Sequence, residues 1–248
     1  FKIDRDPVVG EPFDEEMWGQ IAQEGVRAFI CDSTNVFSRH PGRSESQLPE
    51  PIRELVAGAK GMVVATTFAS NIARLQTLAQ AGVDAGRSVC LLGRAMQRMV
   101  RAGSEAGLLT DFPATISVED ARDVPRANLM LIVTGSQGER RAASASLSRG
   151  SYLGLELQEG DLFLFSSKTI PGNEVGVARI QNALAEKGVD IVDESAGFYH
   201  VSGHANRPDL EAMHDILHPQ VLVPNHGEFR HLREHAQLGV AKGMVGLV

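Results

Sequence analysis

Short apolar runs rich in β-branched residues alternate with segments in which apolar positions recur every three or four residues. Runs of the first kind predict buried strands. Segments of the second kind, such as 71–85 with Ile72, Leu75 and Leu78 on one face, predict amphipathic helices. The expected strands are Ala28–Cys31, Met62–Thr66, Ser88–Leu92, Leu129–Val133, Leu162–Phe165, Val189–Val192 and Val221–Val223. The expected helices are Pro51–Ala59, Asn71–Ala85, Ala95–Ala106, Glu174–Lys187, Pro208–Leu217 and Phe229–Leu238. This alternation predicts an α/β fold with a mostly parallel sheet.

Polar, glycine-containing sequences follow four of the expected strands, namely TFASN, GRAM, TGSQGE and SSKTIPGN. In a parallel sheet these loops gather at the carboxyl edge, where ligands bind, and each leads into a helix whose N-terminus favours an anion. Arg94, Arg140, Arg141 and Lys168 add positive charge there. Each loop alone reads equally well as a turn or a helix cap, but together they favour a phosphate-bearing ligand. Neither the Walker nor the dinucleotide-binding pattern occurs, which disfavours a nucleotide cofactor.

Composition narrows the class of protein. The 248 residues are 43% hydrophobic and 22% charged, as in ordinary globular proteins, and the net charge of −7 argues against non-specific coating of nucleic acid. No apolar run approaches the ~20 residues of a membrane span, and no signal-peptide pattern opens the chain. Cys31 and Cys90 lie in apolar runs and are expected to be buried free thiols, which suits a reducing cytoplasm. The proline-rich stretch HPGRSESQLPEP, residues 40–51, is the expected linker between subregions.

Seven of the eight histidines fall into two groups. His214, His218, His231 and His235 lie in or beside expected helices and read as structural residues. His200, His204 and His226 lie in glycine-containing loops, which can turn an imidazole into a cleft. Asp32 directly follows a strand and reads either as an Asx-turn residue or as a site residue. Together the second group indicates a hydrolytic site, metal-assisted or not, that acts on a phosphate.

Six motifs in one order carry a resemblance to a known family: ICDSTN, TTFASNIARLQ, TGSQGE, IPGNE, HVSGHA and PNHGEFRHL. In order and spacing they resemble ribonuclease J, of the β-CASP branch of the metallo-β-lactamase-fold nucleases. The resemblance covers the whole chain. It implies that residues 1–45 and 200–248 belong to a metallo-β-lactamase (αββα) domain, into which residues 46–199 are inserted as a parallel-sheet β-CASP domain.

The resemblance also implies that this chain is a fragment. In the family, FK typically follows GD, whose aspartate bridges two metal ions, and the sequence here begins one residue later. The H-x-H-x-D-H ligand motif is absent, so the two-zinc site is expected to need ligands upstream. The family's C-terminal domain is absent too. The chain alone is therefore expected to be inactive.

Site roles carry over by resemblance. Asp32, His204 and His226 match the three β-CASP signature positions: His226 as a metal ligand, His204 beside the scissile phosphate, and Asp32 as the residue that orients it. The substrate-binding residues implied are Ala69, Ser70, Asn71, His200, Val201, Ser202, Gly203 and His204.

The sequence departs from the family in two places. Asn206, Arg207 and Pro208 stand where the family usually has a serine followed by Gln-Glu. GERRAA stands where the family usually has GEPMAA, which adds two arginines beside this loop. Asn206 retains the capacity to contact a phosphate, and the helix that follows is expected to offer its positive end.

The implied enzyme is a zinc-dependent ribonuclease with 5′-to-3′ exonuclease activity, and endonuclease activity is also known in the family. It would act in RNA maturation and decay in the cytoplasm, prefer RNA with a 5′-monophosphate, and form a dimer or tetramer when complete. Two alternatives remain: a non-catalytic β-CASP scaffold for RNA processing, and a metallo-hydrolase of small phosphorylated molecules. Intact Asp32, His204 and His226 argue against the scaffold. The inserted domain argues against the small-molecule enzyme.

Overall fold

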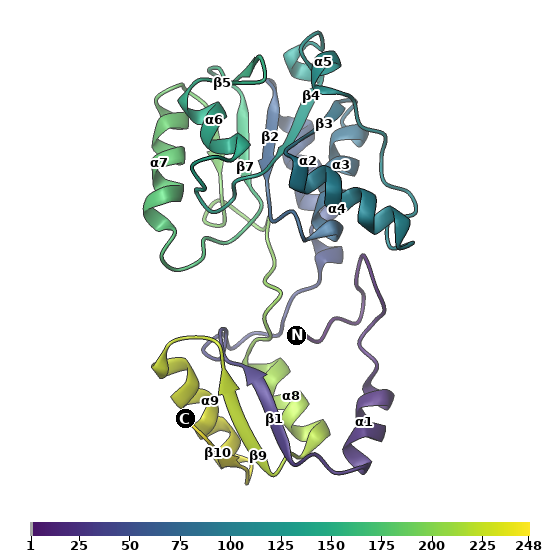
Figure 1. Cartoon of the computed structure of the whole chain (residues 1–248), viewed down its shortest axis with the longest axis vertical. Helices are drawn as coiled ribbons and strands as arrows, with labels where there is room; N and C mark the ends of the chain where they lie inside the picture. Colours follow the sequence, from purple (N-terminus) through teal and green to yellow (C-terminus); the bar gives the residue numbers. More distant parts are fainter. Residues whose placement is uncertain (1) are drawn as a thin grey trace. The chain divides into compact units, whose positions relative to one another are not determined.

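The chain forms two compact units in a computed structural model that describes residues 2–248 (Figure 1). Unit 1 contains the segment up to Pro7 together with Glu11–Ser44 and Val201–Val248. Unit 2 contains Val8–Gly10 and Glu45–His200. The change of unit between Ser44 and Glu45 falls inside the proline-rich stretch 40–51.

Unit 2 is built on a five-stranded parallel sheet in the order β3-β4-β2-β7-β8. All five strands were expected from the sequence, and β3, β4 and β7 begin and end at the expected residues. Their bounds are β2 Val63–Thr66, β3 Ser88–Leu92, β4 Leu129–Val133, β7 Leu162–Phe165 and β8 Asp190–Val192. Since every pair is parallel, the loops after β2, β3, β4 and β7 lie at one edge, as predicted.

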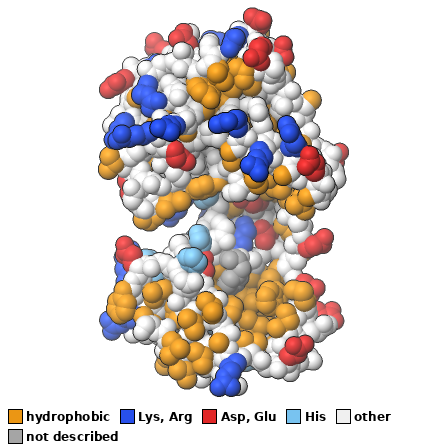
Figure 2. All heavy atoms as spheres, in the orientation of Figure 1, with side chains coloured by type: hydrophobic (Ala, Val, Ile, Leu, Met, Phe, Trp, Pro, Cys, Tyr) orange, Lys and Arg blue, Asp and Glu red, His pale blue; other side chains and the backbone are white. Residues whose placement is uncertain are grey.

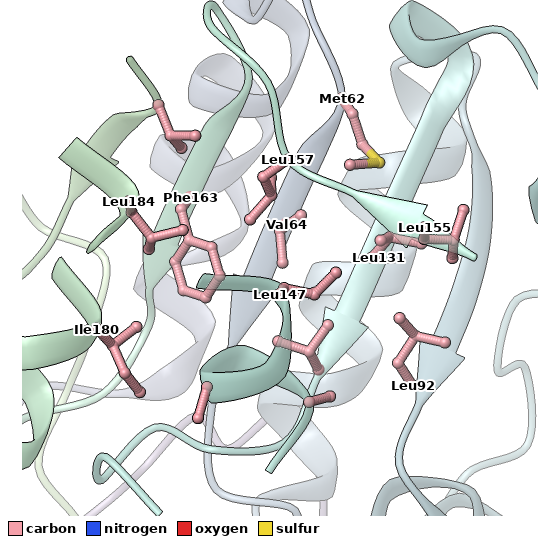
Figure 3. Close-up of a cluster of buried hydrophobic side chains, with 14 of the residues drawn as sticks. Met62, Val64, Leu92, Leu131, Leu147, Leu155, Leu157, Phe163, Ile180 and Leu184 are labelled. Atoms are coloured by element: carbon pink, nitrogen blue, oxygen red, sulfur yellow. The ribbon is translucent and has the colours of Figure 1, made fainter. Parts of the chain in front are cut away.

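Helices cover both faces of this sheet, which explains why its central strands β2, β4 and β7 are buried along their whole length. The helices are α2 Pro49–Gly58, α3 Ile72–Asp84, α4 Arg94–Glu105, α5 Val118–Ala121, α6 Ala143–Arg149 and α7 Glu174–Ala185. On one face, Phe163 and its strand neighbours pack against Leu147 of α6 and Leu184 of α7 (Figure 3). On the other, α3 approaches so closely that a Cβ on its Gly82 would meet Val89 of β3 at 2.7 Å. Short elements complete the unit: η1 Glu45–Gln47, η2 Arg126–Asn128, β5 Ser151–Tyr152 and β6 Leu155–Glu156.

Unit 1 has a three-stranded parallel sheet in the order β1-β9-β10. Its elements are α1 Glu15–Gln23, β1 Ala28–Asp32, α8 Arg207–Leu217, β9 Val221–Asn225, α9 Phe229–Ala241 and β10 Val245–Gly246. One face carries the core, in which Leu222 of β9 packs with Leu210 of α8 and Leu238 of α9. The alternate strand residues point the other way, and Ile30, which pairs with Val223, is 68% exposed.

Both cysteines are buried and free, as predicted. Burial raises the pKa of Cys31 to about 12 and that of Cys90 to about 11, so neither thiol is nucleophilic near neutrality. Within residues 2–248, no helix combines the length and apolarity that a bilayer span requires.

Candidate functional site

Two adjacent strands of unit 1 end in signature residues. Asp32 is the last residue of β1 and pairs with Asn225, the last residue of β9, and His226 follows directly. The amide of Ser33 donates to the carbonyl of Asn225 at 2.7 Å, which fixes the two strand ends together. Because the strands are parallel, Asp32 and His226 emerge at the same carboxyl edge of the sheet.

His204 reaches this edge from the loop before α8 and pairs through Nδ1 with the Asp32 carboxylate. Asp32 is also an Asx-turn residue, since its Oδ1 accepts from the amide and the hydroxyl of Thr34 at 2.9 and 2.6 Å. Burial opposes ionisation of Asp32, but the bonds from Thr34 and His204 outweigh it and lower the pKa of this carboxyl. A carboxylate only accepts hydrogen bonds, so Nδ1 of His204 carries a proton. The carboxylate side chain is 12% exposed and the imidazole 51%, so the pair presents the ring to solvent.

The Ser202–Gly203 turn is held from within unit 1. Ser202 Oγ accepts from the His204 amide and from Asn35 Nδ2, both at 3.1 Å. Both bonds use the hydroxyl oxygen, which leaves its proton for an acceptor outside the turn. A Cβ added to Gly203 would have no atom within 4 Å, so packing does not require glycine there. Val201, by contrast, is buried, and its contact with substrate stays a prediction.

Asn206 corrects one expectation from the sequence. Its side chain is buried, its Oδ1 accepts from Asn35 at 2.9 Å, and its Nδ2 donates to the carbonyl of His40 at 3.1 Å. It also caps α8, in a box in which the Asp209 carboxylate accepts from the Asn206 amide at 3.0 Å. Asn206 is therefore a structural residue and not a phosphate contact. Asp209 also complements the positive N-terminus of α8, which weakens the attraction of that end for a second anion. Whether the helix end contacts a phosphate stays a prediction.

His226 is held in a conformation that side chains rarely adopt. Its φ is 54°, that of Gly227 is 107°, and its amide donates to the Asn225 side chain at 2.9 Å. A non-glycine residue in the left-handed region marks a position where the surroundings impose the backbone, often at functional sites. Over residues 2–248, His, Cys, Asp and Glu side chains nowhere gather in a group of three that could hold a metal. A zinc site needs at least three protein ligands, so His226 and its neighbours do not by themselves fit a zinc ion.

Unit 2 holds the other predicted contact residues around a fully buried arginine, Arg74 of α3. Its guanidinium donates to both oxygens of Glu45 at 2.9 and 2.8 Å, and to the carbonyl and hydroxyl of Ser166 at 2.8 Å. The same group lies 3.3 Å from the carbonyl of Tyr199 and 3.4 Å from His200 Nδ1. Because arginine only donates, Nδ1 of His200 acts as an acceptor.

Asn71 belongs to the same network. Its Nδ2 donates to Glu45 at 3.0 Å, and its Oδ1 caps α3 by accepting from the Arg74 amide at 3.0 Å. Its amide group is therefore engaged with the protein, whereas Ser70 beside it is exposed and Ala69 half-buried. Whether the ASN turn contacts RNA remains a prediction.

Two of the four polar loops at the unit 2 sheet edge are tied to each other. Gln137 of TGSQGE donates to the carbonyl of Lys168 at 3.0 Å and accepts from the amide of Ile170 at 2.8 Å. Gly138, at a φ of 76°, lies against the backbone of Gly176 in α7, where a Cβ would come within 2.4 Å. In these two loops Gln137 and Gly138 therefore serve packing.

A buried histidine pair supports the loop that carries Asp32. His235 of α9 lies 2.9 Å from Ser33 Oγ through Nδ1 and 3.2 Å from Nε2 of His214 in α8. Burial lowers the pKa of both histidines to about 4, so both are neutral near neutrality. The sequence pattern had indicated a structural role for both. Their contact with Ser33 lacked any local signal, because it joins residues 202 apart in the chain.

Comparisons with known proteins agree with this architecture. The profile described as "Ribonuclease J, beta-CASP domain" matches residues 60–184, and the one described as "Zn-dependent metallo-hydrolase RNA specificity domain" matches residues 188–245. "Ribonuclease J" of Sinorhizobium meliloti (strain Sm2011 / Rm2011 / 2011) is 41% identical over 98% of this chain and 43% of its own length. "Ribonuclease J" of Mycolicibacterium smegmatis is 37% identical over 98% and 44%, and "Ribonuclease J 1" of Streptococcus pyogenes serotype M3 is 34% identical over 98% and 44%.

The chain spans less than half the length of these relatives. Among solved structures, a protein of unknown function from Enterococcus faecalis V583 aligns with 84% of this chain and 48% of its own, at a TM-score of 0.49 and 17% identity. That likeness is too weak to add to the assignment.

The parallel sheets and the profile match define an α/β protein that carries a β-CASP domain. The chain belongs to the ribonuclease J family, and its C-terminal part matches the RNA specificity domain of zinc-dependent metallo-hydrolases.

Proposed function

We propose that the complete protein containing this chain is a metal-dependent ribonuclease with 5′-to-3′ exonuclease activity, and endonuclease activity beside it, in RNA maturation and decay. The observation that carries the proposal is the Asp32–His204 pair at the carboxyl edge of the unit 1 sheet, with His226 emerging beside it. Residues 1–45 and 200–248 would then be parts of a metallo-β-lactamase domain, and residues 46–199 its β-CASP insertion. The enzyme would work in the cytoplasm as a dimer or tetramer.

His204 is the group that meets the scissile phosphate in this proposal. The ionised Asp32 accepts a hydrogen bond from Nδ1 and so orients the ring. The other ring nitrogen can then donate to an oxygen of the phosphodiester as negative charge develops there. Asp32 acts through His204, since its own oxygens face Thr34 and the imidazole.

Zinc would supply the electrophilic and water-activating chemistry of this class when bound. His226 would contribute one neutral imidazole ligand, and the other ligands would come from outside this chain. The strained backbone of His226 supports such a role, because it fixes the direction in which the ring leaves the sheet edge.

The Ser202–Gly203 turn would receive the 5′ end of the RNA. The Ser202 hydroxyl proton has no acceptor within the turn, and the space around Gly203 is open. A terminal phosphate carries more charge than an internal diester, so such a pocket should prefer a 5′-monophosphate. A 5′-hydroxyl would leave the donors unpaired, at a cost of about 1–3 kcal/mol.

The test compares exonuclease rates of the complete protein on identical RNAs with 5′-monophosphate, 5′-triphosphate and 5′-hydroxyl ends. Gly203→Ala is the most informative variant, because the added methyl meets no protein atom and should leave the melting temperature unchanged while reducing the preference for the monophosphate. Ser202→Ala should reduce it too, although that change also removes bonds within the turn. Equal wild-type rates on all three RNAs, or full discrimination by Gly203→Ala, would place the 5′ end elsewhere.

A further inference from the structure

Helix α4 of unit 2 carries a stripe of arginines that the proposed site does not use. Arg94, Arg98 and Arg101 are exposed and lie at positions i, i+4 and i+7, so they share one face of the helix. Met96 and Gly103 are buried on the opposite face, where Gly103 packs against Leu109. None of the three arginines takes part in an ion pair among residues 2–248. Figure 2 shows Lys and Arg side chains grouped over this part of the unit.

The three arginines lower the stability of helix α4. Helices α1, α2, α7 and α8 each place an acidic residue in the first turn, where it complements the helix dipole. Helix α4 has none there, and neither have α3, α6 and α9. It begins instead with Arg94, after a glycine N-cap that makes no side-chain cap bond. Arg94 and Arg98 also form a like-charged i,i+4 pair, which is unfavourable in a helix. What distinguishes α4 is that three arginines share one exposed face, whereas its one acidic residue, Glu105, lies at the end of the helix. Helix stability does not account for this grouping.

The stripe continues toward the edge of the sheet where the polar loops lie. Gly93, between β3 and α4, packs against Thr134 at the end of β4, and the Thr134 amide donates to the carbonyl of Leu92 at 3.2 Å. The loop that begins at Thr134 carries Arg140 and Arg141, both exposed. The loop that starts beside the N-terminus of α4 therefore carries two further exposed cations, in a chain whose net charge is −7.

We propose that α4 is a docking surface for the phosphate backbone of a single RNA strand. Guanidinium groups bind phosphate oxygens bidentately and do not lose their charge. Arg94 and Arg101 are about 10 Å apart along the helix axis, at 1.5 Å per residue, which spans more than one phosphate of a strand. The partner is RNA because the chain belongs to the ribonuclease J family, and to that extent the inference rests on the proposed function; the surface itself is distinct from the Asp32–His204 site.

The test measures RNA binding by the complete protein without reference to cleavage. A fluorescent oligouridylate with a non-hydrolysable backbone is titrated with wild type and with Arg98→Gln/Arg101→Gln. Glutamine has nearly the helix propensity of arginine, so the helix should persist and the melting temperature should stay level or rise. Affinity should fall about tenfold at low salt, and the slope of log K against log salt should become shallower by about 1.4, or ~0.7 for each phosphate that the variant no longer neutralises.

The matched control is Lys60→Gln/Arg179→Gln, which removes the same charge from two exposed positions of unit 2 outside the stripe. It should bind RNA almost as wild type does. Equal losses in both variants, or none in the α4 variant, would overturn the proposal. Tighter binding of polyglutamate or of anionic vesicles than of RNA would overturn RNA as the partner. If wild type binds RNA through α4 but cleaves none, the docking surface stands and the proposed nuclease function fails.

Discussion

At the scale of single residues, the three signature positions are placed for different tasks. His204 is half exposed and pairs with the nearly buried carboxylate of Asp32. His226 has a constrained backbone and makes no such ion pair within residues 2–248. The first arrangement suits a group that moves or shares a proton. The second suits a ligand whose direction must be constant.

This difference gives a prediction for the complete protein. His204→Ala should leave the zinc content intact and lower the cleavage rate ~10²–10³-fold, the usual cost of removing one transition-state hydrogen bond. His226→Ala should lower the zinc content as well as the rate. Metal analysis beside single-turnover kinetics checks both. Loss of zinc from His204→Ala to the same extent as from His226→Ala would contradict the division of roles.

The sequence pattern selected Asp32, His204 and His226 as candidates by their loop positions, but their separate roles and their contacts were implied only by the family resemblance. Asp32 and His204 are 172 residues apart and make contact because β1, β9 and the loop before α8 meet at one edge. No local pattern reports such a contact. The misjudged role of Asn206 has the same origin, because its partners Asn35 and His40 lie more than 160 residues earlier in the chain.

At the scale of elements, Arg74 ties together the two points where the chain enters and leaves unit 2. Glu45 is the first residue after the entry, and Tyr199 and His200 are the last before the exit. One guanidinium therefore holds both segments and the cap of α3. We expect it to set the position of His200.

Arg74→Met should destabilise the protein by about 3–5 kcal/mol, because it leaves the poorly exposed Glu45 carboxylate and two carbonyls without their donor. Glu45→Gln should also destabilise it, and the double variant should cost less than the sum of the two. Urea unfolding of all three gives the coupling energy. The matched control is Arg53→Met, whose partner Glu50 is exposed, and it should leave the free energy of unfolding nearly unchanged because solvent screens the pair. Additive effects of Arg74 and Glu45 would mean that the pair does not act as a unit.

The packing of α8 against α9 through His214 and His235 makes stability depend on pH. Burial lowers the pKa of each imidazole from 6.5 to about 4. Positive charge acts in the same direction, from Lys242 on His214 and from His214 and Arg207 on His235. The carboxylates of Asp215 and Glu211 near His214, and of Asp32 near His235, act in the opposite direction. Below pH 6.5 the unfolded chain binds protons that the folded chain does not, so stability falls as the pH is lowered from about 6.5 toward 4.

Between pH 7 and 5 this linkage should remove about 2 kcal/mol of stability for each imidazole. His214→Phe should reduce the pH dependence, since phenylalanine keeps an aromatic ring beside Phe29 and does not titrate. His218→Asn removes an exposed histidine at a left-handed position that asparagine tolerates, and it should leave the pH dependence unchanged. Denaturant unfolding at a series of pH values checks this, and the same slope for His214→Phe as for wild type would refute it.

Whether an element could be predicted from the sequence depended on how its residues are buried. Strands β2, β3, β4 and β7 were located closely because they are short, almost entirely apolar runs that the helices bury on both faces. Helix α6 was missed because it consists mainly of Ala and Ser and has no apolar periodicity, and Ser146 bonds back to the carbonyl of Ala142. Helix α1 was missed because it has no buried residue, and β10 because a two-residue strand has no period.

At the scale of the whole molecule, unit 1 has an apolar sheet face without a cover. Ile30 is 68% exposed, Val245 is 57% exposed, and Val223 pairs with Ile30 on the same face. A contiguous apolar surface of this kind marks a place where other protein packs. The chain spans less than half the length of its relatives, so we expect the rest of the complete protein to cover this face.

Ile30→Lys distinguishes a covered face from a free one. In the chain by itself, the change should raise solubility and reduce the binding of a hydrophobic dye, with little change in the free energy of unfolding, because the side chain is already exposed. In the complete protein, the same lysine would be buried without a partner and should cost several kcal/mol. Chemical unfolding of both forms measures the contrast, with Ile170→Lys, at an exposed isoleucine of unit 2, as the control that should be mild in both. If Ile30→Lys changes the free energy of unfolding equally little in the two forms, this sheet face is exposed in the complete protein too. The expectation that the rest of the protein covers it would then be wrong.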